Sequence, residues 1–179
     1  QLYGFVHRDK MRWKLSEAFH GWSPPISRHD HFRRKYRPVL KLVAARTREL
    51  VVLGIQEGAG ILILDQVEAD YQVKVAPKGT RHNLQHNAMG KLALSRRPDL
   101  AAKIRSPKLH RELVQIREAG VAWNRQETVA GMIAMAVPGF SNAPTEPMIA
   151  IAWPISRFSE NKARKALRII RKGLLGKSV

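Results

Sequence analysis

Cysteine is missing from this sequence of 179 residues. Its absence excludes disulfides, thiolate metal sites and a cysteine nucleophile, and it fits a reducing cytosol. Long apolar runs are missing too: the stretch 132–140 contains Pro138 and Gly139 and is far shorter than the roughly 18 residues of a membrane helix. The first residues mix basic, polar and aromatic side chains, unlike a signal peptide. These absences predict a soluble cytoplasmic protein without a membrane partner.

Acidic residues are scarce: 14 Asp and Glu stand against 32 Lys and Arg, which gives a formal charge of +18. Hydrophobic residues still make up 44% of the chain. This fraction excludes a disordered polycation, because disorder requires low hydrophobicity together with high net charge. The length fits one folded domain with a small appendage. A strong positive field attracts polyanions, so nucleic acid is the first partner to consider.

The positive charge is concentrated at the two ends of the chain. Between Gln1 and Arg48 there are twelve Lys and Arg against three Asp and Glu, and we interpret this cluster as a nucleic-acid contact. After Glu160 the chain has seven Lys and Arg and no further acid. We interpret this second run as a solvated helix face, which is the commoner meaning of such a pattern.

Apolar alternation and helical spacing predict the first elements. A hairpin is expected over Tyr3–Leu15, with a corner at Arg8-Asp9-Lys10, followed by a linker at Ser23-Pro24-Pro25. Apolar residues at helical spacing predict a helix from Asp30 to Arg48, which Asp30 would cap. Pro38 should kink this helix or interrupt its hydrogen bonds.

The remainder of the chain predicts an α+β fold, with one antiparallel sheet flanked by helices. Strands are expected at Leu50–Ile55, Gly60–Val67, Tyr71–Ala76, near Ala122, at Gly131–Val137 and at Met148–Trp153. Helices are expected at Ala88–Ser95, Asp99–Ile104, Pro107–Ala119 with Gly120 as its end, and after the capping residue Ser159. The first three strands are joined by short turns and should form a meander.

Several short motifs, taken in their order and spacing, resemble one protein family. They are Leu64-Asp65-Gln66-Val67-Glu68, Gly79, Ala88-Met89-Gly90-Lys91-Leu92, Arg117-Glu118-Ala119-Gly120-Val121, the pair Glu127 and Gly131, and Pro154-Ile155-Ser156-Arg157. Each motif is weak alone, but together they extend from residue 64 to residue 157. The chain resembles the IclR family of bacterial transcriptional regulators over its C-terminal effector-binding domain.

The resemblance implies a profilin/GAF-like sheet domain at residues 30–179 that binds a small organic effector and forms homodimers or tetramers. It also implies that residues 1–15 are the β-wing that ends a winged helix-turn-helix, joined by a linker at 16–29. Arg8, Lys10 and Arg12 in this wing would contact DNA. Base readout in this class comes from a recognition helix. The chain shows no such helix before the wing, so we expect it to bind DNA weakly and without sequence preference.

The resemblance places the effector against one face of the sheet, at the N-terminus of the helix that begins at Ala88. A helix N-terminus offers free N–H groups and a partial positive charge, which suit a carboxylate. Asn87 is placed to cap this helix, so the amides of Ala88, Met89 and Gly90 would face the ligand. The alternative is a capped structural helix with no ligand.

Carried over by position, the implied pocket also includes residues of three strands: Asn124, Met132, Ala134, Ala150 and Ala152. Several members that bind small acids have an acidic residue in place of the asparagine and serines in place of the last two alanines. Methyl groups cannot hydrogen-bond a keto-acid, so a glyoxylate-like effector is disfavoured. With Met89, Met135 and the nearby Trp153, the set favours an aromatic or larger apolar acid. The alternative is that these side chains are plain core.

No group of residues in the sequence predicts catalysis, a cofactor or a metal. The serines and the seven histidines show no nucleophile–base arrangement. Asp65 and Glu127 are better explained as structural hydrogen-bond acceptors than as an acid–base pair. Two histidine clusters are weak candidates for a metal site, because such a motif needs a third ligand and a supporting context: His82 with His86, four residues apart in a loop-like segment, and His29 with His31 beside Asp30. Some members of the family bind a metal in the pocket, so this alternative stays open.

The leading hypothesis is therefore the ligand-sensing and oligomerising domain of a transcription factor. Its effector would shift the dimer between two arrangements and so change DNA binding. The rival hypothesis is a basic nucleic-acid-associated module without an effector, in which Trp13, Phe32 and Tyr36 would stack on bases. A GAF-like enzyme is a third hypothesis, but it lacks a visible catalytic group.

Overall fold

The computed structural model of the chain describes residues 6–9, 12–15, 29–68 and 81–176. The first two ranges form an antiparallel hairpin of β1 (Val6–Asp9) and β2 (Arg12–Leu15). The predicted hairpin is thereby confirmed as a pair of strands. Other predictions lie outside the described residues, namely those for Lys10, Ser23-Pro24-Pro25, the strand Tyr71–Ala76 and Gly79.

A six-stranded antiparallel sheet forms the centre of the domain, in the strand order β5-β4-β3-β8-β7-β6. The strands are β3 (Leu50–Glu57), β4 (Gly60–Val67), β5 (Arg81–Asn83), β6 (Ala122–Arg125), β7 (Met132–Pro138) and β8 (Met148–Pro154). The predicted α+β fold is confirmed, and the short edge strand β5 is an addition that the sequence pattern does not indicate. A two-residue turn joins β3 to β4, and its Gly58 has a φ of 59°, a left-handed conformation that suits glycine.

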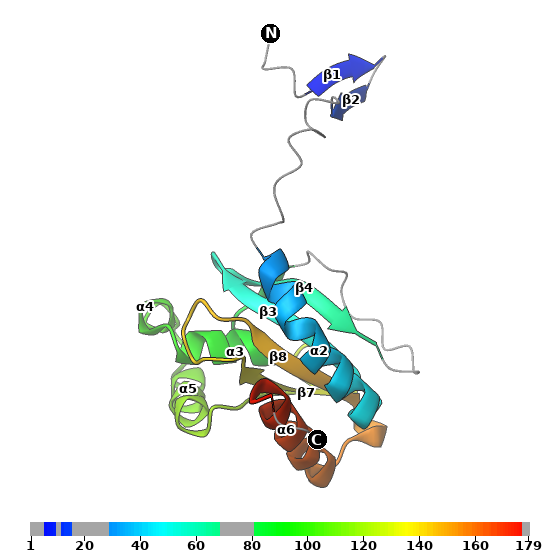
Figure 1. Cartoon of the computed structure of the whole chain (residues 1–179). Helices are drawn as coiled ribbons and strands as arrows, with labels where there is room; N and C mark the ends of the chain where they lie inside the picture. The colour runs from blue at the N-terminus through cyan, green and yellow to red at the C-terminus, as the bar shows by residue number, and fades with distance from the viewer. Residues whose placement is uncertain (1–5, 10–11, 16–28, 69–80, 177–179) are drawn as a thin grey trace.

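Helices cover both faces of the sheet (Figure 1). On one face α2 (Asp30–Thr47) and α6 (Glu160–Leu174) lie side by side, and α2 continues through Pro38. The other face is covered by α3 (Ala88–Ser95), α4 (Pro98–Ala101) and α5 (Pro107–Ala119). A 3₁₀ turn, η1 (Ile155–Arg157), follows β8 directly. In the part of the chain that the structure describes, no helix is long and apolar enough to cross a membrane.

Local sequence signals define the ends of the helices. The side chains of Asn87, Ser106 and Ser159 each accept a hydrogen bond from the backbone N–H three residues later. Gly120 ends α5 with a φ of 66°, as its position predicts. The cap predicted for α2 is wrong. Asp30 is the first helical residue, and its carboxylate pairs with a guanidinium one turn later instead of capping the backbone.

The apolar core has two parts, one on each face of the sheet. Ile151 and Trp153 of β8 belong to the part under α2 and α6, whereas Ala150 and Ala152 belong to the part under α3, α4 and α5. The division follows from strand geometry, because successive side chains of a strand point to opposite faces. The small residues of β8 therefore all face α3, and this alternation positions the candidate site.

Candidate ligand-binding site

Small side chains on two neighbouring strands leave a hollow beneath α3. Ala134 of β7 pairs with Ala152 of β8, and Ala136 pairs with Ala150. All four alternate onto the α3 face, so methyl groups stand where larger side chains would reach the helix. The result is a cavity of about 480 Å³, which lies within the range of small-molecule sites.

The cavity brings together seven of the eight residues that the sequence predicts for a ligand site. These are Ala88, Met89, Asn124, Met132, Ala134, Ala150 and Ala152. They come from α3, β6, β7 and β8, so segments that are distant in the chain meet around one space. The wall also includes residues that the pocket prediction omits: Leu50, Val52, Ile63, His82, Thr128 and Val129.

Gly90, the eighth residue, faces away from the cavity. A Cβ at this position would lie 2.2 Å from the backbone oxygen of Leu84, so the close approach of these two segments requires glycine. The Gly90 N–H donates to the side chain of Asn87 at 2.7 Å and is not available to a ligand, which corrects the expectation for this amide. The amides of Ala88 and Met89 have no acceptor among the described residues.

His82 contributes an unsatisfied polar atom to the cavity wall. It lies on β5 opposite Ile61 of β4, and its Nε2 is buried without a hydrogen-bond partner in the described part of the chain. Buried polar atoms normally have a partner. A carboxylate or hydroxyl group of a ligand suits this nitrogen. The sequence pattern marks His82 only as a weak metal ligand, because its place in the sheet depends on the pairing of β5 with β4.

The amide of Asn124 holds the loop that follows β6. Its Nδ2 donates to the backbone oxygen of His86 at 2.5 Å and to Oγ1 of Thr128 at 2.7 Å, while its Oδ1 accepts from the N–H of Glu127 at 3.0 Å. These bonds occupy both amide protons and the amide oxygen. Asn124 therefore shapes the wall of the cavity and has no proton left for a ligand.

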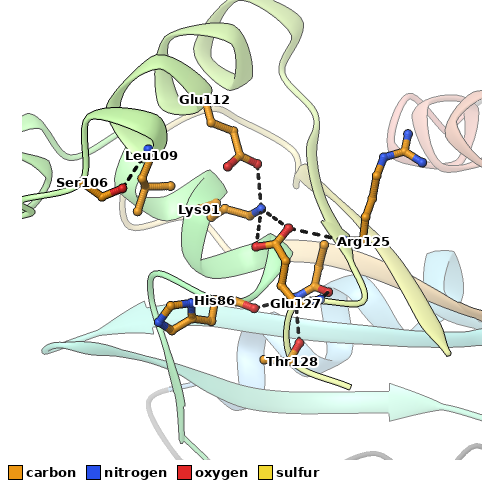
Figure 2. Close-up of polar contacts among 9 residues, drawn as sticks. His86, Lys91, Ser106, Leu109, Glu112, Arg125, Glu127 and Thr128 are labelled. Carbon is orange, nitrogen blue, oxygen red and sulfur yellow. Dashed lines mark hydrogen bonds and ion pairs between the residues drawn. The ribbon is translucent and has the colours of Figure 1, made fainter. Parts of the chain in front are cut away.

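Next to the cavity, Lys91 of α3 is a buried cation that joins three elements (Figure 2). Its Nζ donates to Glu112 of α5 at 2.6 Å and to both carboxylate oxygens of Glu127 at 2.7 and 2.9 Å. The Lys91 side chain is only 1% exposed, and a buried charge is tolerated only when it is paired. The network therefore fastens α5 and the loop after β6 to α3. Glu127 acts as a structural acceptor, as predicted, and Asp65 does the same for Arg37 at 2.6 Å.

Met135 and Trp153, which the sequence pattern places near the pocket, lie on the opposite face of the sheet. Each is one residue out of step with Ala134 or Ala152, and alternation along the strand turns it toward α2 and α6. Both side chains are 1% exposed. They belong to the packed core, and the expectation that they contribute to the pocket is wrong.

A polar cluster on the α2–α6 face fastens the loop between β7 and β8. The buried Tyr36 hydroxyl donates to the Glu146 carboxylate and accepts from the N–H of Phe140 at 2.9 Å. Burial raises the pKa of Tyr36 above its usual range, and the bond to Glu146 acts in the same direction. Burial also lowers the pKa of the nearby Arg96. Because Tyr36 is fully buried, it is not available to stack on bases.

His29 and His86, two of the histidines that the sequence pattern offers as weak metal ligands, make other contacts in the structure. Nε2 of His29 lies 3.3 Å from a carboxylate oxygen of Glu57, and the backbone oxygen of His86 accepts a bond from Asn124. Within residues 29–68 and 81–176 and the two hairpin strands, no three His, Cys, Asp or Glu side chains gather closely enough to hold a metal ion.

Comparison with known sequences identifies relatives of this chain. The sequence model of one family, described as "Bacterial transcriptional regulator IclR C-terminal", matches residues 26–106 and 100–174. The HTH-type transcriptional regulator BhcR of Paracoccus denitrificans is 32% identical over 166 residues, which cover 83% of this chain and 60% of that protein. The probable transcriptional regulator SauR of Cupriavidus necator is 28% identical over 139 residues, 68% of this chain and 55% of that protein. This chain thus spans little more than half the length of these relatives.

Solved structures share the fold. The IclR protein of Thermotoga maritima superposes with a TM-score of 0.74 at 24% identity, covering 96% of this chain and 77% of that one. An IclR homolog from Microbacterium hydrocarbonoxydans, solved in complex with 4-hydroxybenzoate, gives a TM-score of 0.75 at 19% identity over 98% of this chain and 82% of that one. At these identities the likeness establishes the architecture, an antiparallel sheet flanked by helices.

Proposed function

Because this chain belongs to the IclR family of bacterial transcriptional regulators, we propose that its cavity binds a small organic acid and that binding changes how the whole regulator attaches to DNA. One observation carries the proposal. Seven residues expected at a ligand site, from four separate elements, meet around a single cavity of about 480 Å³. A cavity of this size beside a buried histidine nitrogen that has no hydrogen-bond partner among the described residues is typical of a binding site.

The cavity wall supports a ligand with an apolar body and one charged end. Alanine, methionine and valine side chains dominate the wall, and burial of apolar surface against them contributes roughly 25 cal/mol per Å². The amides of Ala88 and Met89 at the N-terminus of α3, together with His82, supply the polar end. A helix N-terminus adds only about 0.3–2 kcal/mol for an anion. Most of the affinity therefore comes from the apolar body, which favours an aromatic acid.

We further propose that residues 1–15, which include the hairpin of β1 and β2, are a DNA-contacting wing, and that Arg8, Lys10 and Arg12 are the residues that contact DNA. Residues 16–29 would be a linker and residues 30–179 the effector domain. The chain should bind duplex DNA without sequence preference, and the binding should weaken steeply with salt. A competition assay that showed tight preference for one operator over random duplex at physiological salt would contradict this.

Assembly as a dimer or tetramer is also part of the proposal, because regulators that read palindromic sites are usually twofold symmetric. Sedimentation of the chain at micromolar concentration should show at least a dimer. A strict monomer would count against assembly through this domain and leave the contact to other parts of the regulator.

The pocket is tested with Ala150→Phe, which places a ring inside the cavity. Thermal shift of the parent chain should reveal stabilisation by aromatic acids such as 4-hydroxybenzoate, while glyoxylate and pyruvate should have little effect. Ala150→Phe should abolish that stabilisation. The matched control Ala119→Phe adds the same ring at an exposed position of α5 and should keep it. Stabilisation by the small keto-acids, with the same affinity in Ala150→Phe, would show that the site or its polarity is wrong.

The polar end is tested with His82→Ala. Loss of one hydrogen bond to a charged group is worth about 1.5–3 kcal/mol, so the dissociation constant for 4-hydroxybenzoate should rise by roughly tenfold or more. Phenol lacks the carboxylate, so its dissociation constant should rise less in His82→Ala. Equal rises in the dissociation constants of the two ligands would show that the carboxylate does not contact His82.

A further inference from the structure

Cations from both ends of the chain meet on one surface, the outward side of α2 and α6. The two helices lie side by side (Figure 1), and a Cβ built on Gly173 of α6 would be 3.2 Å from Val39 of α2. Seven Lys and Arg on the outward side are exposed: Arg34, Lys41, Arg164, Lys165, Arg168, Arg171 and Lys172. We call these seven residues the cationic plate. The charge run that looks like a plain solvated helix face in the sequence is therefore one half of a larger surface.

The cationic plate lacks counter-charges of its own. None of its seven members forms an ion pair with another described residue. The two acidic residues of these helices are engaged elsewhere, Asp30 with Arg33 and Glu160 with Arg125 at 3.0 Å. The plate therefore carries seven positive charges that the described part of the protein leaves unneutralised.

Helix stability does not explain this distribution of charge. Arg168 has like charges at both four-residue spacings, Arg164 and Lys172, and such pairs weaken a helix. Cations in the last turn of α6 interact favourably with the helix dipole. Arg164 and Lys165 lie in the N-terminal half of α6, where a cation gains nothing from the dipole. An ordinary solvated helix face mixes both signs. Because the plate carries positive charge only, it points to a polyanionic partner.

We propose that the cationic plate binds the phosphate backbone of duplex DNA, as a contact separate from the hairpin. At 1.5 Å per residue, the 15 residues of α6 and the 18 of α2 give a surface about 22–27 Å long. A duplex presents one charge per roughly 1.7 Å of axis, so about 13 to 16 phosphates lie along that length. Seven cations match the roughly six to ten phosphate contacts of a typical DNA-binding protein.

Other occupants of this surface fit less well. A second copy of the plate would set seven cations against seven, which like-charge repulsion disfavours. The choice of DNA over another polyanion rests on the proposed function, because a transcriptional regulator works on DNA. The phosphate chemistry itself does not depend on the wing or on the cavity.

The experiment compares the DNA binding of two variants, one that lacks four charges of the plate and one that lacks four charges elsewhere. The plate variant is Lys41→Gln, Lys165→Gln, Arg168→Gln and Arg171→Gln. The control is Lys103→Gln, Arg105→Gln, Lys108→Gln and Arg111→Gln, four exposed cations in and beside α5 on the other side of the sheet. Both variants lose the same net charge. Apolar burial of residues such as Ala166 and Ile170 holds α6 in place, so these exposed substitutions should leave the fold intact.

Binding to a fluorescent random-sequence duplex is measured by anisotropy in the full chain, between about 50 and 200 mM salt. The plate variant should bind at least tenfold more weakly. Its log–log salt slope should fall by about 0.9 for each phosphate that the variant no longer neutralises, or 3 to 4 in all. The control should change affinity less than about threefold, since screening weakens charges that do not touch the duplex.

Three results would overturn the inference. The first is an equal loss of DNA affinity in the plate variant and in the control, which would show that net charge alone accounts for the binding. The second is a plate variant whose affinity for DNA equals that of the parent. The third is a parent chain that binds phosphatidylserine vesicles as tightly as DNA and loses both affinities equally in the plate variant. A parallel Arg8→Gln, Lys10→Gln, Arg12→Gln variant tests the wing separately. If only that variant loses DNA binding, the plate is wrong while the proposed function stands.

Discussion

The two faces of the sheet use small residues in opposite ways. On the α2–α6 face the alanines belong to the helix: Ala163 and Ala166 of α6 are buried and allow the helix to lie directly over large strand residues such as Trp153. On the α3 face the alanines belong to the strands, as at Ala134 and Ala152, and they leave space under the helix. The same strands thus build one sealed face and one hollow face. The position of the small residue, rather than its presence, decides between a packed face and a face with a cavity.

The faces also differ in how they hold positive charge. On the α3 side, Lys91 is buried and paired with Glu112 and Glu127, so its charge serves the architecture. On the α2–α6 side, the cationic plate is exposed and without ion pairs among the described residues. Paired buried charge fastens elements together, whereas unpaired exposed charge is available to a partner.

The largest expected difference between the faces follows from truncating one large side chain on each. Trp153→Ala should lower the free energy of unfolding by about 3–5 kcal/mol, because the indole is buried and contacts the ring of Phe158 at 5.7 Å between centroids. Met132→Ala, beside the existing cavity, should cost less than about 1 kcal/mol. Urea unfolding measures both. Similar losses would mean that the α3 face is packed as tightly as the other.

Adding volume instead of removing it should sharpen the same contrast. Ala166→Phe has no space to enter, since Ala166 is fully buried between α6 and the sheet, and it should cost about 1–3 kcal/mol. Ala150→Phe enters the cavity and should be neutral or stabilise by up to about 1 kcal/mol. Chemical denaturation of the two variants decides the point, and a large loss in Ala150→Phe would show that the hollow closes in solution.

Breaking the Lys91 network should affect the hollow face alone. Lys91→Met should cost about 1–3 kcal/mol, less than for a fully buried pair, because Glu112 and Glu127 are about a third exposed and regain water. The loop after β6 should loosen, and 4-hydroxybenzoate should bind more weakly. Glu118→Gln, an exposed glutamate of the same helix α5, is the matched control and should leave both quantities unchanged.

The smallest expected effect is on the free energy of unfolding, and it concerns Tyr36 on the sealed α2–α6 face and its dependence on pH. Tyr36→Phe should cost about 1 kcal/mol at neutral pH through the lost bond to Glu146. The pKa of Tyr36 is raised in the folded state, so the stability from its protonated hydroxyl is complete below the unfolded pKa of about 10 and falls as pH rises beyond it. Unfolding free energies from neutral to alkaline pH should show this decline in the parent and a weaker one in Tyr36→Phe. Parallel curves would assign the decline to other groups.

Most of the fold is predictable because local signals agree with the tertiary structure. The residues Asn87, Ser106, Ser159 and Gly120 mark helix ends by their own chemistry, and helices α3 and α5 begin and end where expected. The strand β5 is not predictable in this way. It has three residues, and its pairing with β4 depends on a partner rather than on its own pattern. The place of His82 in the cavity wall is unpredictable for the same reason.

The cavity itself is predictable only in part. Alternation along β7 and β8 places Met132, Ala134, Ala150 and Ala152 on one face, which explains why they meet. Proximity in sequence is a poorer guide, since Met135 and Trp153 are neighbours of cavity residues and yet face the other way. The role of Gly90 depends on the approach of Leu84, a tertiary contact without a local signal.

Methyl NMR tests in a single sample whether one face of the sheet takes a ligand while the other is sealed. The parent chain is labelled at the alanine and methionine methyls and titrated with 4-hydroxybenzoate. The methyls of Met132, Ala134 and Ala152 should shift with saturation, while those of Met135 and Ala166 stay in place. Shifts at Met135 or Ala166, or no saturable shift at the cavity with any acid of an aromatic panel, would show that the α3 face is not the ligand-binding face.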